Sequence, residues 1–205
     1  MSEALELLDW RRHVAELFAD LRRRPPNAET LAWFRAQKDD LFRHHPQSPI
    51  PETERSAFTG LTYWPHDPEA RVLARFVAAP PSEPIPASVN PSEATLRLVG
   101  HLEFTYHQRA ATLGAYWVEG YGGGLIVPFK DATSNHATYG GGRYALDTIK
   151  SADLGSDWAA NTVVLDFNYA YHPSCVYDPH WVCPLAPPEN TLPFLVEAGE
   201  QLPAH

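Results

Sequence analysis

The sequence predicts a mainly β fold of the α+β class: an antiparallel β-barrel or sandwich with two N-terminal helices packed on it. Apolar residues recur at three- and four-residue steps in residues 3–23 and 28–43, which is the helical period. From residue 71 onward they alternate or form short runs between turns rich in Gly and Pro, as in antiparallel strands. The 205 residues, 44% of them hydrophobic, are enough for one domain with a sizeable core and few for two.

The chain is predicted to divide into a helical hairpin, residues 1–45, and a β-rich core, residues 50–205, which belong to the same domain. Pro25 and Pro26 end the first helix, and Asn27 can cap the second. The apolar stripe of the first helix consists of Leu7, Trp10, Val14, Leu17, Phe18 and Leu21. The pattern of the second helix includes Leu31, Phe34, Lys38, Leu41 and Phe42. The polar faces mix Glu with Arg, so we expect the helices to pack on the barrel or on a partner subunit and not on a membrane.

The strands are predicted over residues 71–79, 95–107, 110–118, 125–129, 143–149 and 162–171, with 193–198 as a further candidate. Residues 80–93 are rich in Pro and are expected to form a loop or linker. The clearest alternation is in residues 95–107. One face there consists of Leu96, Leu98, Leu102, Phe104 and Tyr106.

The formal net charge is -9, which disfavours nucleic acid and anionic membranes as partners. The basic clusters at residues 11–12 and 22–24 lie in a helical pattern rich in Glu and Asp, which is typical of a solvated face. The N-terminus lacks the apolar core of a signal peptide, and no stretch approaches the ~20 apolar residues that span a bilayer. We therefore expect a cytoplasmic protein that binds neither nucleic acid nor membrane. A homo-oligomer is compatible with the sequence.

The tetrapeptide Tyr-Gly-Gly-Gly occurs twice, beginning at Tyr121 and at Tyr139. Neither copy ends in the Lys-Ser/Thr of a phosphate-binding loop, and the dinucleotide fingerprint is absent, so no cofactor is assigned. Residues 122–124 are best explained as a hairpin turn, because glycine adopts positive φ without strain. Residues 140–142 lead directly into Arg143 and form either a turn or the wall of a ligand site.

His101, Glu103 and His107 share one face of a predicted strand and have the composition of a metal site. About 20 Å separates the two histidines along an extended strand, which is too far for one ion. A two-ligand site of His101 and Glu103, completed from elsewhere, stays open.

A second metal-like set has a symmetric spacing and consists of His172, Cys175, His180 and Cys183. The loop between its two pairs is shorter than in common zinc modules. A zinc site, a disulfide and two reduced cysteines are the alternatives, and we expect reduced cysteines without metal.

The predicted strand 162–171 places Asp166 and Asn168 on one face, among strong strand formers. Buried polar side chains need partners, and Arg143 also lies in a predicted strand. One interpretation is therefore structural, with Arg143 and Asp166 paired across neighbouring strands. The other is functional: the same two residues form a small-molecule site in which the guanidinium binds a carboxylate or phosphate.

The predicted ligand-binding residues are Asp131, Thr133, Tyr139, Arg143, Tyr144, Asp166 and Asn168. In this hypothesis Asp131 or Asp166 holds Arg143 or accepts a proton, and the tyrosines form the walls of the pocket. Neither a nucleophile elbow nor a Ser-His-Asp order is present, so catalysis is left open. The alternative is a non-catalytic module whose polar residues are internal struts and whose partner is another protein or a second copy of itself.

Three motifs occur together: Thr-Tyr-Gly-x-Gly-Arg-Tyr from Thr138, Asp-Phe-Asn-x-Ala-Tyr from Asp166, and Cys-Pro-Leu-x-Pro-Pro from Cys183. With this combination the chain resembles the bacterial and archaeal family called domain of unknown function 1684, over nearly all residues after the first helix. The matched positions are Asp131, Thr133, Thr138, Tyr139, Gly142, Arg143, Tyr144, Asp166, Phe167, Asn168, Tyr171, Pro173, Cys175, Cys183, Pro184 and Asn190. The chain departs from the pattern at Asn135 (usually Gly), Ala145 (usually Leu) and His172 (usually Asn), and the last departure weakens the zinc interpretation. The resemblance implies no established activity.

Overall fold

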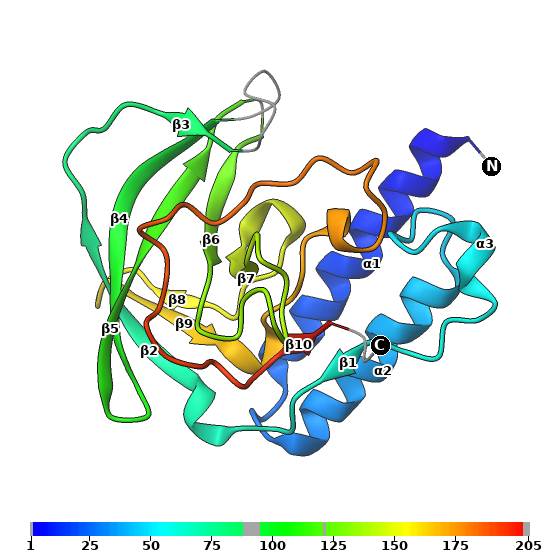
Figure 1. Cartoon of the computed structure of the whole chain (residues 1–205), viewed down its shortest axis with the longest axis horizontal. Helices are drawn as coiled ribbons and strands as arrows, with labels where there is room; N and C mark the ends of the chain where they lie inside the picture. Colours follow the sequence, from blue (N-terminus) through cyan, green and yellow to red (C-terminus); the bar gives the residue numbers. More distant parts are fainter. Residues whose placement is uncertain (1, 88–94, 121, 203–205) are drawn as a thin grey trace.

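The computed structural model describes residues 2–87, 95–120 and 122–202, and in them three helices pack against a curled antiparallel sheet (Figure 1). The helices are α1 (Glu3–Arg23), α2 (Ala28–His44) and the single turn α3 (Glu52–Arg55). Asn27 caps α2 as predicted, because its Oδ1 accepts the backbone N–H of Thr30 at 2.9 Å. The mainly β, α+β prediction with two N-terminal helices is confirmed.

The main sheet is antiparallel and has the order β7-β6-β5-β4-β2-β9-β8, with β3 pairing beside β4. Its strands are β2 (Arg71–Ala78), β3 (Ile85–Pro86), β4 (Thr95–Tyr106), β5 (Arg109–Val118), β6 (Gly124–Phe129), β7 (Arg143–Asp147), β8 (Ser156–Asp157) and β9 (Thr162–Asp166). A separate pair joins β1 (Thr62–Tyr63) to β10 (Glu200–Gln201).

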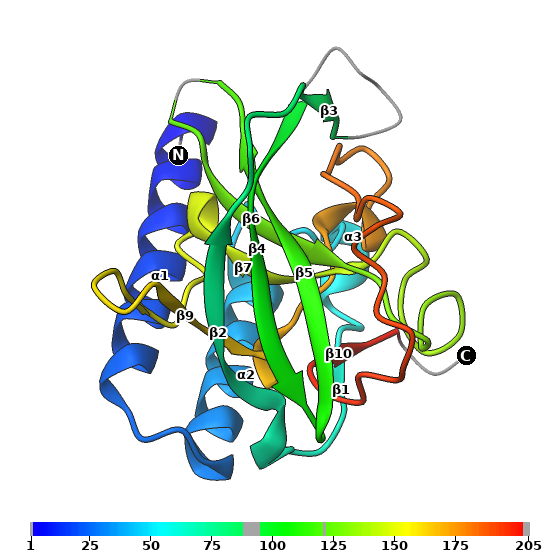
Figure 2. The same ribbon diagram turned by 90° about the vertical axis from the view of Figure 1, so that its left-hand side faces the viewer.

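The sheet curls into a half-barrel, and Figure 2 shows how its long strands β4 and β5 bend. The curl brings β7, at one end of the sheet order, to the chain that follows β9. There Tyr144 and Tyr171 exchange two backbone hydrogen bonds, with N···O distances of 2.9 and 3.2 Å. Of the two predicted alternatives, barrel and sandwich, the sheet therefore forms a partly closed barrel.

The core lies inside the curl and follows the alternation predicted for β4. Leu102, Phe104 and Tyr106 are buried, whereas Arg97 and Thr105 are exposed. The inward aromatic rings pack on one another around Phe167. The centre of its ring lies 5.2 Å from that of Phe129 and 5.6 Å from those of Phe104 and Tyr106.

The helices cover the sheet through a second apolar cluster. Phe18 of α1 and Phe34 of α2 meet edge to face, and Phe34 in turn packs against Tyr169 beyond β9. The C-terminal part of the stripe predicted for α1, Phe18 and Leu21, and Phe34 of α2 pack toward the β-rich part of the chain, whereas Leu7 is exposed and Trp10 packs on Phe42 of α2. In the part of the chain that is described, no helix combines the length and apolar character needed to cross a bilayer.

Two predicted strands end early, and both end at an aspartate. The strand predicted over 143–149 stops at Asp147, whose Oδ1 accepts the N–H groups of Ile149 and Lys150 and starts a 3-10 turn. The strand predicted over 162–171 stops at Asp166, whose Oδ1 accepts the N–H of Asn168 at 3.0 Å. In both places the short aspartate side chain binds backbone N–H groups that would otherwise donate to a neighbouring strand. The prediction that Asp166 and Asn168 share a strand face is therefore wrong.

The candidate strand 193–198 is extended but has no strand partner. Its residues alternate as a strand would, with Phe194, Val196 and Ala198 buried and Leu195 and Glu197 exposed. Some of its carbonyl groups bind other donors: Phe194 O accepts the N–H of Ala132 at 3.1 Å, and the carbonyls of Val196 and Ala198 accept from a side chain described below.

The two glycine-rich stretches form turns. Gly122 and Gly123 lie in the β5–β6 connection and Gly124 begins β6; Gly122 has φ +72° and the N–H of Gly123 bonds to Gly120 O, which confirms the hairpin turn. Gly142 has φ +97° and precedes β7. A Cβ built on it would lie 2.5 Å from the carbonyl oxygen of Phe129. Both the positive φ and this close contact therefore require glycine here.

We predict that Gly142→Ala lowers the free energy of unfolding by about 3 kcal/mol or more, because it adds a steric clash to the cost of positive φ. Gly155→Ala is the matched control: Gly155 has φ +100°, and a Cβ added there would meet nothing within 4 Å, so it should lose only about 1–2 kcal/mol. Urea denaturation of the two variants measures the difference. Equal losses would show that the contact with Phe129 does not determine the turn.

Candidate functional site

Arg143, the first residue of β7, is enclosed by protein with 1% of its surface exposed. Its Nη2 donates to Asp131 Oδ2 at 2.8 Å and to Val196 O at 2.9 Å. Its Nη1 donates to Ala198 O at 2.5 Å and to Glu200 O at 3.1 Å. Burial lowers the pKa of Arg143, and the neighbouring carboxylate of Asp131 opposes that shift. The guanidinium therefore stabilises the carbonyl groups of the extended segment that lacks a strand partner.

The predicted pair between Arg143 and Asp166 is wrong. Asp166 instead bonds to Arg71 Nη1 at 3.3 Å, because β2 and β9 are neighbours and these two residues face each other in the register. In the sheet order β7 and β9 are separated by four strands. A strand-neighbour argument cannot identify the partner of Arg143, since Asp131 lies in a loop.

The structure brings five of the seven predicted site residues into one region, and all five are held by protein groups. Asp131 Oδ1 accepts the N–H of Thr133 at 2.6 Å, and the Tyr144 hydroxyl donates to Pro184 O at 2.6 Å. The backbone N–H of Tyr139 donates to His172 Nε2 at 3.3 Å.

Asp166 and Asn168 lie apart from that region and hold a loop. Asn168 Nδ2 donates to Asp67 O at 2.7 Å, and Asn168 Oδ1 accepts the N–H of Asp67 at 2.9 Å. Together with the Arg71 pair, these contacts fasten the start of β2 to the end of β9. Their geometry is that of a structural connection.

Glu200 forms a buried polar network that the sequence reasoning missed. Its carboxylate is paired with Lys38 of α2 and accepts the N–H of His172 at 2.7 Å and the hydroxyl of Tyr177 at 2.9 Å. Burial would raise the pKa of Glu200, but Lys38 and His172 together bring it below its usual value. The available signal was Lys38 itself, a lysine inside the apolar pattern of a helix. Its partner is 162 residues away, so no local pattern identifies it.

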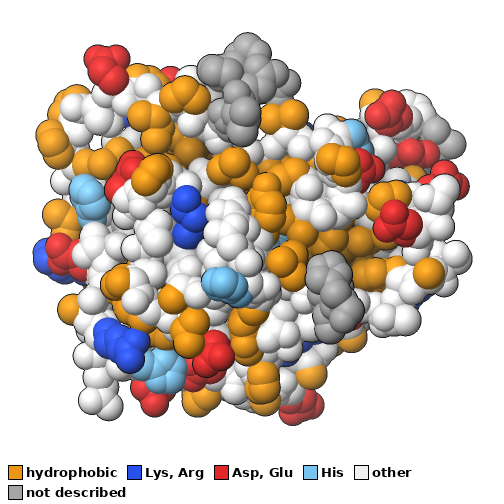
Figure 3. All heavy atoms as spheres, in the orientation of Figure 1, with side chains coloured by type: hydrophobic (Ala, Val, Ile, Leu, Met, Phe, Trp, Pro, Cys, Tyr) orange, Lys and Arg blue, Asp and Glu red, His pale blue; other side chains and the backbone are white. Residues whose placement is uncertain are grey.

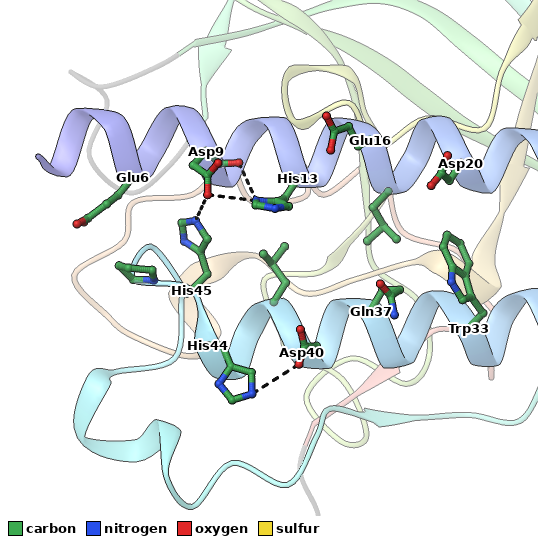
Figure 4. A pocket seen from close by; sticks show the side chains of 13 residues that line it. Glu6, Asp9, His13, Glu16, Asp20, Trp33, Gln37, Asp40, His44 and His45 are labelled. Atoms are coloured by element: carbon green, nitrogen blue, oxygen red, sulfur yellow. Dashed lines mark hydrogen bonds and ion pairs between the residues drawn. The ribbon is translucent and has the colours of Figure 1, made fainter. Parts of the chain in front are cut away.

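A groove of about 660 Å³ opens between α1 and α2 (Figure 4). It is lined by Glu6, Asp9, His13, Glu16, Leu17, Asp20, Trp33, Gln37, Asp40, Leu41, His44, His45 and Pro46. The five acidic residues in this lining are accompanied by three histidines and by no Lys or Arg among the described residues. The groove therefore combines a negative rim with an apolar floor.

Asp9 is the polar centre of the groove. Its Oδ2 lies 3.4 Å from His13 Nδ1 and 3.4 Å from His45 Nε2, as the dashed lines in Figure 4 mark. The three ligand atoms lie within 4.8 Å of one another, a spacing that one metal ion could bridge. However, His45 Nδ1 accepts the N–H of Gln47 at 3.0 Å, so a neutral ring carries its proton on Nε2 and has no lone pair for a metal there. His13 Nδ1 hydrogen-bonds to the backbone carbonyl of Asp9 at 3.1 Å, and both imidazole rings lie beside the Asp9 carboxylate.

The two metal-like sets predicted from the sequence include residues that pair with other side chains of the protein. Within the described residues, the ligand atoms of His172, Cys175, His180 and Cys183 do not gather around one point. His180 pairs with Asp178 at the surface.

In the set predicted on the strand 95–107, Glu103 pairs with Arg75, and His107 hydrogen-bonds to Asp67 Oδ2 at 2.6 Å.

The family model for a protein of unknown function, DUF1684, matches residues 56–201. The chain belongs to this family. A protein of Haloarcula marismortui in the solved structures, an uncharacterized protein determined by solution NMR, is 34% identical with a TM-score of 0.58, over 84% of this chain and 92% of that one. No curated protein matches the chain. The description of DUF1684 names no activity, and its match begins after the groove between α1 and α2.

We predict that Arg143→Lys lowers the free energy of unfolding by about 3 kcal/mol, because an ammonium group cannot serve four acceptors that need a planar fork. Arg71→Lys is the control: it keeps the positive charge of a partly exposed side chain beside Asp166 and should cost less than about 1 kcal/mol. The same wild-type protein should show no thermal shift with a panel of carboxylates and phosphates. A stable Arg143→Lys protein together with an anion-dependent rise in Tm would instead support the anion site.

We predict that His172 makes stability depend on pH between about pH 4 and 6.5. Burial lowers the pKa of His172 from 6.5 to about 4, so in this window the unfolded chain binds a proton that the folded chain does not. Stability should fall as the pH is lowered through the window, by up to about 3 kcal/mol from this residue. His172→Gln should flatten the decrease measured by urea denaturation at pH 7 and pH 5, whereas His136→Gln, at an exposed site, should not. Identical pH slopes in both variants would contradict the prediction.

Proposed function

We propose that this protein binds a small organic cation in the groove between α1 and α2, without catalysing a reaction. The observation that carries the proposal is the lining of the groove, which among the described residues combines five Asp or Glu with no Lys or Arg. A volume of about 660 Å³ lies in the range of small-molecule sites. On the face that Figure 3 shows, Asp and Glu side chains are scattered over the helical and the β-rich parts, whereas the larger Lys and Arg patches lie over the β-rich part on the left.

The acidic residues are arranged along one side of α1. Asp9, Glu16 and Asp20 follow each other at steps of seven and four residues, which place them on one helix face. Asp9 and Asp20 are about 16 Å apart along the axis at 1.5 Å per residue. Asp20 also pairs with Arg23, an exposed ion pair that a ligand ammonium group can replace at little cost. This length suits an extended ligand with more than one ammonium group, such as a di- or polyamine.

The floor of the groove suits the carbon chain of such a ligand. Leu17 of α1 and Leu41 of α2 line the groove, and Trp33 lies toward one end of it (Figure 4). The Asp9 carboxylate, which lies 3.4 Å from one ring nitrogen of His13 and of His45, can accept a hydrogen bond from an ammonium group. The overall charge of -9 attracts a cation toward the groove at low ionic strength.

The contacts of Arg143 support the strut hypothesis over the anion-site hypothesis. Arg143 lines neither the groove nor the small cavity beside Thr30 and Tyr169. An anion at Arg143 would have to displace Asp131 or the carbonyl groups that the guanidinium already binds. We therefore assign Arg143, Asp131 and Asp166 to the support of the fold.

Isothermal titration calorimetry with putrescine and spermidine tests the proposal. We expect the triamine to bind more tightly, and binding to weaken as salt rises. The double variant Asp9→Asn/Asp40→Asn should weaken binding about tenfold, since each exposed ion pair contributes up to about 1 kcal/mol. The control Glu83→Gln/Glu197→Gln removes the same charge from exposed sites outside the groove and should bind as the wild type does. Absent binding, or an equal loss in both double variants, would refute the proposed site.

A further inference from the structure

Two cysteines lie together in a part of the fold that the proposed groove does not use. Cys175 is half-buried in the 3-10 turn Ser174–Val176, and Cys183 is buried in the irregular segment that follows. Both are free thiols, and their side chains hydrogen-bond to each other. The Cys175 side chain also hydrogen-bonds to Tyr139.

The loop that joins the two cysteines is fastened near both ends. The Tyr177 hydroxyl donates to Glu200, and the carbonyl of Pro184, next to Cys183, accepts the Tyr144 hydroxyl at 2.6 Å. Two residues further, the N–H of Ala186 donates to Gly141 O at 3.0 Å. The thiols are thus held near each other by contacts that do not involve sulfur, which reduces the entropy lost when the sulfurs join.

The surroundings distinguish the two thiols chemically. The Cys183 sulfur accepts the Cys175 thiol and the N–H groups of Cys175 and Ser174, and it lies near Lys150. These contacts lower the pKa of Cys183 to about 6, whereas the hydrogen bond to Cys183 raises the pKa of Cys175. A sulfur that accepts several hydrogen bonds and lies beside a second thiol is the arrangement in which one sulfur attacks an oxidant and the other completes a disulfide.

We propose that Cys175 and Cys183 are a reversible oxidation site that forms an intramolecular disulfide with a hydroperoxide as oxidant. The Cys183 thiolate attacks the O–O bond, which breaks to give a sulfenic acid at Cys183 and releases the alcohol, or water from hydrogen peroxide. The Cys175 sulfur then attacks the Cys183 sulfur, its proton leaves with the hydroxyl group as water, and the S–S bond forms. In total two thiols and one hydroperoxide give one disulfide, one alcohol and one water.

The disulfide would act on the turn that precedes Arg143. Tyr139 bonds to Cys175, and Gly141 and Tyr144 bond to the chain just after Cys183. Joining the sulfurs closes a covalent loop across these contacts. We expect the oxidised protein to unfold at higher urea concentration than the reduced protein, because the link restricts the unfolded chain.

The experiment treats the reduced, folded protein with a small molar excess of hydrogen peroxide and measures free thiols, intact mass and migration on a non-reducing gel. We expect both thiols to disappear, the mass to fall by two hydrogen atoms without dimer formation, and dithiothreitol to restore both. Cys175→Ser should stop at the sulfenic acid, trapped by dimedone at Cys183. Cys183→Ser should react much more slowly and leave Cys175 reduced.

Three results would overturn the proposal: persistent free thiols in the folded wild type, oxidation to sulfinic acid without a disulfide, or a disulfide between two chains. Circular dichroism of each variant before treatment separates these results from misfolding. A misfolded serine variant would not change the conclusion, because the wild-type mass and thiol content decide the outcome alone.

Discussion

The charge of Arg143 has no access to water, and its neutralisation positions several distant parts of the chain. Desolvating an isolated charge costs several kcal/mol, so the guanidinium must be surrounded by acceptors. Asp131 supplies the negative charge, and the carbonyl groups of Val196, Ala198 and Glu200 accept from Nη1 and Nη2, whereas the buried Nε has no hydrogen-bond partner among the described residues. The C-terminal segment therefore follows a path determined by a side chain. Arg143 supplies this segment with hydrogen-bond donors, which a neighbouring strand supplies elsewhere in the sheet.

A second buried charge continues this connection to the helices. The carbonyl of Glu200 binds Arg143, while its carboxylate binds Lys38 of α2 and the N–H of His172. One residue thus links the half-barrel, the C-terminal segment and the helical layer. Removing Lys38 would leave the buried Glu200 carboxylate without its cation, and removing Arg143 would leave the backbone carbonyl of the same residue without a donor, so the two sites depend on one another energetically.

The two proposed sites belong to different parts of the chain. The groove is formed by α1 and α2, before the residues that match DUF1684, whereas Cys175 and Cys183 lie within the matched range. The resemblance to the family, which the motifs around Arg143 and Asp166 indicated, is confirmed. Those motif residues are mostly buried and bound to other protein groups, which explains them through stability.

Local patterns in the sequence determined the local structure. The three- and four-residue period predicted α1 and α2, the side chain of Asn27 predicted the cap, and alternation predicted the buried face of β4. These features depend on residues within a few positions of one another, and the same holds for the hairpin at residues 122–124.

The tertiary structure alone decided which distant groups meet. The sequence singled out Arg143 as a residue in need of a partner, but the choice of Asp131 over Asp166 depends on the strand order and on the path of a loop. The pairing of Lys38 with Glu200 and the meeting of Asp9 with His45 have the same origin. Periodicity shows which side of an element is buried, whereas the curl of the sheet and the crossing of the helices determine what lies opposite, and those depend on packing over the whole chain.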